Sequence, residues 1–89
     1  PNPEERLLKT KLASLINDAI EERGWTQQKI ADYLGLEQPH VSDLSRGRLS
    51  RFSVERLLYL LGKLERHVTI TVRRKKGSKP LEEIVVGSR

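Results

Sequence analysis

Residues 25–47 (WTQQKIADYLGLEQPHVSDLSRG) constrain the fold of this chain more than any other segment. They contain two short amphipathic stretches separated by a Leu-Gly-Leu turn at residues 34–36. The second stretch places Val41 and Leu44 on one side and polar side chains on the other. Two short helices at a steep angle around a glycine-containing turn form a helix-turn-helix, whose second helix is sized to enter the major groove of DNA. The segment therefore predicts a local fold and a mode of binding together.

Length and composition limit the remaining possibilities. With 89 residues, the chain has room for one domain and a modest core. It has no cysteine, which excludes disulfides and thiolate metal sites and suits a reducing cytoplasm. No apolar run is long enough to span a membrane, and no secretory signal opens the sequence. Because the chain begins at Pro1 and not at a methionine, we expect that residues before it were removed.

Positive charge follows the predicted helix-turn-helix. Residues 1–45 carry 5 Lys and Arg against 8 Asp and Glu, a net charge of −3. Residues 46–62 carry +3 (4 against 1), and residues 63–89 carry +5 (8 against 3). A basic zone that begins where the second helix of the motif ends is the pattern expected for phosphate neutralisation. A solvated basic surface is the alternative, and charge alone does not separate the two.

The first three helices can be placed from apolar spacing and capping residues. One long helix is predicted over residues 4–23. Its expected buried face consists of Leu8, Leu12, Leu15, Ile16, Ala19 and Ile20. Thr26 is expected to cap the second helix with its hydroxyl group. Because Pro39 is tolerated only in the first turn of a helix, we expect the third helix over residues 39–45 with Gln38 as its N-cap.

The pattern changes after the fourth helix. Ser53 is expected to cap that helix, and its buried face is expected to contain Val54, Leu57, Leu58, Leu61 and Leu64. Residues 67–72 then alternate apolar and threonine side chains, as in a half-buried strand. We expect the apolar face of this strand to pack on the fourth helix, and its backbone needs a partner. Residues 74–89 are predicted to be a basic linker and tail, whose apolar run 84–86 either pairs or stays disordered.

The pattern resembles the Cro and lambda-repressor-like (XRE) family of helix-turn-helix domains. The residues that carry the resemblance are Thr26, Gln27, Ile30, Ala31, Leu34, Gly35, Val41, Ser42, Leu44, Arg46 and Gly47. The resemblance implies a mainly α, lambda-repressor-like helix-turn-helix bundle with a short C-terminal β-strand, within residues 1–73. Residues 52–58 and 67–72 extend the pattern, and the longer pattern looks like the HigA-type antitoxin branch of the family.

Eight polar residues are candidates for DNA contact. The resemblance places Gln38 at a base-contacting position, where an amide can pair with adenine, and Gln27 at a phosphate-anchoring position. The expected base-contacting residues are Gln38, His40, Ser42 and Asp43. The expected phosphate-contacting residues are Gln27, Arg46, Arg48 and Arg51, because amides at a helix N-terminus and guanidinium groups suit phosphate oxygens.

Each assignment has a plainer alternative. Gln38 could serve only as a helix cap, and Gln27 could be an exposed side chain without a role. An acidic Asp43 either accepts a hydrogen bond from cytosine or only positions His40 or Arg46. The arginines that follow the third helix could be solvated.

These features predict a sequence-specific DNA-binding transcriptional repressor. One reading helix per chain suggests a homodimer on an inverted-repeat operator. The HigA-type resemblance implies an antitoxin that also neutralises an mRNA-cleaving toxin of the RelE or HigB kind. A stand-alone regulator without a toxin and a protein-interaction module on the same fold are the alternatives.

The sequence does not indicate an enzyme. His40 and His67 have no partners at metal-ligand spacing, and neither a nucleophile elbow nor a glycine-rich phosphate loop occurs. No catalytic residue, metal or cofactor is therefore predicted.

Overall fold

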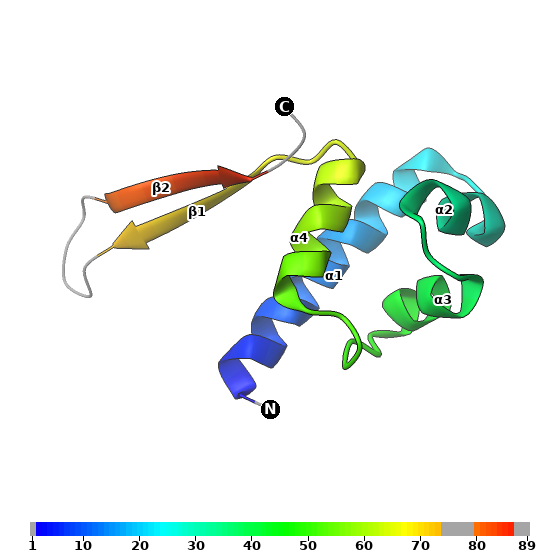
Figure 1. The fold of residues 1–89 in the computed structure, drawn as a ribbon, viewed down its shortest axis with the longest axis horizontal. Helices are drawn as coiled ribbons and strands as arrows, with labels where there is room; N and C mark the ends of the chain where they lie inside the picture. Colours follow the sequence, from blue (N-terminus) through cyan, green and yellow to red (C-terminus); the bar gives the residue numbers. More distant parts are fainter. Residues whose placement is uncertain (1, 74–79, 87–89) are drawn as a thin grey trace.

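The computed structural model of the chain describes residues 2–73 and 80–86, and it contains four helices followed by a β-hairpin (Figure 1). The elements are α1 (Pro3–Arg23), α2 (Gln27–Leu34), α3 (Gln38–Arg46), α4 (Val54–Lys63), β1 (Val68–Arg73) and β2 (Pro80–Val86). Helices α1 and α4 pack together in the middle of the molecule. Helices α2 and α3 lie on one side of this pair, and the hairpin extends on the other (Figure 1). The predicted mainly α bundle with a C-terminal β element is confirmed.

Side-chain caps define where α2 and α4 begin. The Thr26 hydroxyl accepts a hydrogen bond from the Lys29 N–H at 3.1 Å, and the Ser53 hydroxyl accepts one from the Arg56 N–H at 3.0 Å. Each bond satisfies a backbone donor that has no partner within its own helix. Both predicted caps are confirmed.

The beginning of α3 differs from the prediction. Glu37 is the N-cap and Gln38 is the first helical residue, so the prediction that Gln38 caps the helix was wrong. The Glu37 carbonyl already accepts from the His40 N–H at 2.9 Å, which starts the helix one residue earlier than expected. Pro39 fits the second helical position because no N–H is needed in the first turn. The Gln38 amide is therefore not used as a cap.

The core is built where the four helices meet. Its buried members are Leu12, Ala13, Ile16, Ala19, Ile30, Ala31, Leu34, Leu36, Val41, Leu44, Leu49, Phe52, Leu57, Leu60, Leu61 and Leu64. Of the face predicted for α1, Leu8 and Leu15 are instead 45% and 52% exposed. The six predicted positions cover a wider arc of the helix than its neighbours can bury, so the outer members remain in solvent.

The C-terminal strand already has a partner in its own chain. β1 pairs with β2 in an antiparallel register that places Val68 opposite Val86 and Ile70 opposite Ile84. Only Val68 packs partly against the core, and residues 69–73 are exposed, so the prediction that the strand lies on α4 was wrong. Because β2 satisfies one edge of β1, the strand does not need α4 as support. The predicted basic linker at residues 74–79 lies outside the described residues.

Two ion pairs tie the start of the hairpin to the end of α1. An Arg66 guanidinium nitrogen lies 2.8 Å from Glu22 Oε1, and an Arg23 guanidinium nitrogen lies 3.4 Å from Glu65 Oε1. Glu65 itself has a positive φ of 63°, which turns the chain after α4. The carboxylates are exposed, so each pair orients the chain more than it stabilises it.

Candidate nucleic-acid interface

The turn between α2 and α3 depends on a glycine. Gly35 has φ 70° and ψ 32°, in the left-handed region, and its N–H donates to the Ala31 carbonyl at the end of α2. The Leu36 N–H donates to the same carbonyl at 2.9 Å, and the Leu36 side chain is buried. A residue with a Cβ would be strained at this φ, whereas glycine is not. The turn therefore fixes the angle at which α3 leaves α2.

An asparagine of α1 holds the other end of α3. The Asn17 side-chain Nδ2 donates to the carbonyl oxygen of Leu44 at 3.0 Å, in a half-buried position. This carbonyl belongs to the last turn of α3, where backbone acceptors lack partners within the helix. Sequence reasoning missed Asn17, although its position beside the buried residue Ile16 was an available signal. α3 is thus fixed at the turn before it and at its last turn.

The four predicted base-contacting residues are not equally accessible. Gln38 is exposed, whereas His40, Ser42 and Asp43 are half-buried. Gln38 and Ser42 are four residues apart in α3, so they lie on the same face of the helix. These two side chains therefore project from α3 in the same direction.

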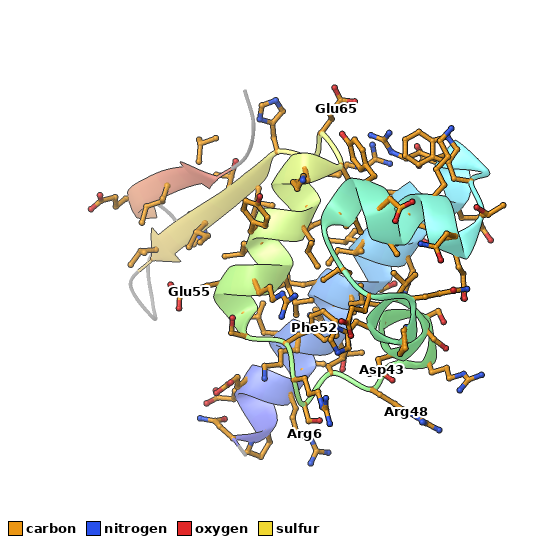
Figure 2. The ribbon with its side chains drawn as sticks, turned by 45° about the vertical axis from the view of Figure 1, so that its right-hand side comes forward. Arg6, Asp43, Arg48, Phe52, Glu55 and Glu65 are labelled. Atoms are coloured by element: carbon orange, nitrogen blue, oxygen red, sulfur yellow. The ribbon has the colours of Figure 1, made fainter. Side chains whose placement is uncertain are left out.

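His40 lies closer to the core than expected. Its ring lies 6.5 Å from the Phe52 ring, centre to centre, with the planes at 82°. Phe52 is buried between α1, α3 and α4 (Figure 2). The prediction that His40 lies on the exposed side of α3 was therefore only partly correct, because one side of the ring packs on an aromatic residue from beyond the helix.

Asp43 does not position its neighbours in the way that the plainer alternative required. Among the described residues, no hydrogen bond or ion pair joins its side chain to His40 or Arg46. Its backbone carbonyl accepts from the N–H groups of Gly47 and Arg48, which closes the end of α3. Its carboxylate therefore keeps its hydrogen-bonding capacity.

The predicted phosphate-contacting residues stand at both ends of the motif. Gln27 is exposed at the first position of α2, and the backbone N–H groups of Gln27 and Gln28 donate to no acceptor in the described chain. A helix N-terminus with free N–H groups attracts phosphate through its dipole and its donors. This end of the motif can therefore anchor a DNA backbone.

Three exposed arginines lie at the end of α3 and in the loop that follows it. Arg46 is the last residue of α3, and Arg48 and Arg51 follow Gly47. No ion pair occupies any of the three within the described residues. Figure 2 shows the Arg48 side chain pointing away from the body of the protein. These guanidinium groups are free to contact phosphate oxygens.

An aromatic cluster stabilises the segment that leads into α2. Trp25 and Tyr33 meet edge to face with centroids 5.3 Å apart, and the Lys29 ammonium lies 4.4 Å from the Trp25 centroid. The Tyr33 hydroxyl donates to the Lys63 carbonyl at 2.9 Å, which joins α2 to the end of α4. The cluster therefore holds the start of α2, and with it Gln27, in a fixed position.

Comparison with known proteins agrees with this geometry. The family model of the helix-turn-helix domain matches residues 1–73. A solved structure assigned to the XRE family of transcriptional regulators matches 100% of this chain and 100% of its own chain, with a TM-score of 0.81 and 39% sequence identity. The chain belongs to the XRE family of helix-turn-helix proteins. No curated protein matches this XRE-family chain. The HigA-type branch stays a prediction.

Within residues 2–73 and 80–86, no group of three or more His, Asp or Glu side chains could hold a metal ion. No helix in this part of the chain combines the length and the apolar character that a membrane span requires.

Proposed function

We propose that this XRE-family protein is a sequence-specific DNA-binding transcriptional repressor that reads the major groove with α3. The observation that carries the proposal is the placement of Gln38 and Ser42 on one face of α3, between the free N-terminus of α2 and the arginines after α3. A rigid reading helix with phosphate anchors at both ends is the arrangement that helix-turn-helix recognition needs.

In this proposal, base and phosphate contacts are made by different residues. The Gln38 amide donates to adenine N7 and accepts from N6, and Asp43 accepts from cytosine N4. Ser42 bonds a base edge beside Gln38, and the outer side of His40 reaches a base or a phosphate. Phosphates are held by Gln27 with the free N–H groups of α2. They are also held by the arginines at the end of α3 and in the loop after it, namely Arg46, Arg48 and Arg51.

The proposed repressor binds as a homodimer through its hairpin. Ile70, Val72 and Ile84 share one face of the hairpin and are 39%, 45% and 47% exposed. The hairpin extends from the side of the α1–α4 pair opposite α2 and α3 (Figure 1), so contact there leaves α3 free for DNA. A two-fold axis pairs the same apolar face on each subunit, and two copies of α3 then read an inverted repeat.

We further propose that the protein is an antitoxin, on the basis of its resemblance to HigA-type sequences. The outer backbone edges of the hairpin support this, because an exposed strand edge can pair with the sheet of a partner. Purification from the native host, followed by identification of bound proteins, tests this part. A small basic ribonuclease of the RelE or HigB kind is expected, and recovery of the homodimer alone would favour a stand-alone regulator.

The DNA-binding function is tested by selection followed by salt titration. A random duplex pool selected on the protein should yield an inverted repeat with half-sites about one helical turn apart. Affinity for that duplex, measured by fluorescence anisotropy from 50 to 200 mM salt, should fall steeply because each phosphate contact releases a counterion. A flat salt dependence and no enriched sequence would instead support a protein-interaction module.

A further inference from the structure

A shallow groove lies between the first half of α1 and the loop that joins α3 to α4. It has a volume of about 430 Å³. The groove is lined by Arg6, Lys9, Thr10, Gly47, Leu49 and Ser50. A neighbouring hollow shares Thr10, Gly47 and Leu49 and reaches Arg46 at the end of α3. The groove therefore borders the arginine-containing loop but lies outside the reading face of α3.

The α1 side of the groove supplies two cations. Arg6 is exposed, and its guanidinium makes no ion pair within the described residues. The Lys9 ammonium lies 3.5 Å from Glu5 Oε2, so its charge is partly balanced. The Thr10 hydroxyl is already used, because it donates to the Arg6 carbonyl at 2.9 Å. Arg6 is thus the principal free cation of the groove.

The loop side supplies backbone donors. The loop is held by hydrogen bonds from the N–H groups of Gly47, Arg48 and Phe52. The N–H groups of Leu49, Ser50 and Arg51 donate to no acceptor in the part of the chain that the structure describes. Consecutive free N–H groups beside a guanidinium suit an anion with several oxygens.

We infer that this groove binds a backbone phosphate of DNA, so that α1 extends the contacts made by the loop arginines. The inference rests on the proposed DNA-binding function. Figure 2 shows Arg6 and Arg48 along the same edge of the molecule, although they belong to α1 and to the end of α3. A DNA strand held by the loop therefore has Arg6 beside it. The groove is open to solvent and its lining combines polar and apolar surface, which suits a phosphodiester that stays partly hydrated better than an enclosed organic ligand.

The test compares three variants of equal charge change on one helix. Arg6→Gln and Lys9→Gln remove the groove cations, and Lys11→Gln removes an exposed α1 cation that does not line the groove. For Arg6→Gln, the slope of log affinity against log salt should become shallower by about 0.9. Its affinity should fall about 15-fold at 50 mM salt and about fourfold at 200 mM, on all duplexes alike. Lys11→Gln should keep the wild-type slope, and Arg6→Lys should restore most of it.

Ethylation interference identifies the phosphate itself. Ethylation of one operator phosphate should weaken wild-type binding and have no effect on Arg6→Gln. The DNA-free protein is then titrated with inorganic phosphate, and binding is monitored by NMR through the amide resonances of Ser50 and Arg51. This titration distinguishes a DNA phosphate from a free phosphate ion as the ligand. Saturation at submillimolar inorganic phosphate would overturn the DNA assignment in favour of a free anion.

Two further outcomes would overturn the inference in distinguishable ways. If wild type shows a steep salt slope but Arg6→Gln and Lys9→Gln behave like Lys11→Gln, the groove takes no phosphate and the DNA-binding function stands. If wild type itself shows no salt dependence, both the groove and the DNA-binding function fail. Circular dichroism spectra of the Arg6 variants and of Lys11→Gln should match the wild type, because both side chains are exposed and neither makes an ion pair within the described residues.

Discussion

The side-chain amide of Asn17 in α1 donates to the backbone carbonyl of Leu44 in α3 across 3.0 Å. The two residues are 27 positions apart, and Leu44 is fully buried. This bond connects α1 to α3 and gives the Leu44 carbonyl a second donor beside the Gly47 N–H. The orientation of α3 therefore depends on a residue outside the helix-turn-helix motif.

Replacement of Asn17 with Ala should destabilise the fold and loosen α3. The free energy of unfolding should fall by about 1 kcal/mol, because the Leu44 carbonyl loses one of its two donors and keeps the Gly47 N–H at 3.2 Å. Urea denaturation measures this change, with Ser14→Ala on the exposed side of α1 as the control. If both variants unfold at the same urea concentration, the bond does not stabilise α3.

The sequence predicted features that depend on a few neighbouring residues. The Thr26 and Ser53 caps and the Gly35 turn require only local backbone geometry, so their residue types sufficed. The Asn17–Leu44 bond and the packing of His40 on Phe52 join residues from different elements. Periodicity within one helix carries no information about such contacts, which explains why the exposure of His40 was overestimated.

The hairpin illustrates the same limit. Alternation identified β1, and the apolar run at residues 84–86 was recognised, but its pairing was left open. Strand pairing depends on the register between two segments rather than on either segment alone. In the structure, Ile70 lies opposite Ile84 and one backbone edge of β1 is paired with β2. The Ile70 side chain is 39% exposed, whereas a lone strand packed on α4 would bury it.

Replacement of Gly35 with Ala should destabilise the helix-turn-helix through the backbone alone. A Cβ at this position would meet nothing within 4 Å, so steric contact adds no cost. The positive φ of 70° should lower the free energy of unfolding by about 1–2 kcal/mol. Gly35→Asn should cost less in the same urea titration, because asparagine tolerates left-handed geometry. Equal losses for Ala and Asn would contradict this explanation.

Replacement of Gln38 with Ala should change base preference. The cost should be about 1–3 kcal/mol on the selected operator and should vanish when one base pair is changed. The salt slope should remain that of the wild type. Binding measured on a panel of single-base operator variants checks this, and uniform weakening across the panel would assign Gln38 to the phosphates.

Replacement of Arg48 with Ala should leave base preference unchanged and alter the salt dependence of binding, the reverse of what is expected for Gln38→Ala. Affinity should fall on specific and non-specific duplexes alike, and the salt slope should become shallower by about one unit. Arg66→Ala is a suitable control because it also removes one arginine. Arg66 is paired with Glu22 and lies outside the proposed DNA-binding surface. A change in base preference for Arg48→Ala would contradict its role as a phosphate anchor.

The hairpin face can be tested without removing the hairpin. Ile70→Thr combined with Ile84→Thr keeps residues that favour strands but makes the proposed dimer face polar. Each subunit of the homodimer loses two apolar side chains, so four are lost in all. At about 1 kcal/mol for each side chain that is only partly buried on association, the dimer should be weakened roughly a thousandfold. Val85 is 68% exposed and lies on the opposite face, opposite Thr69, so Val85→Thr is the matched control. Sedimentation equilibrium of the wild type, the double variant and the control measures the dimer dissociation constant directly.

If the double variant and the control dimerise as tightly as the wild type, the subunits meet elsewhere, and the exposed Leu8 and Leu15 of α1 become the surface to examine.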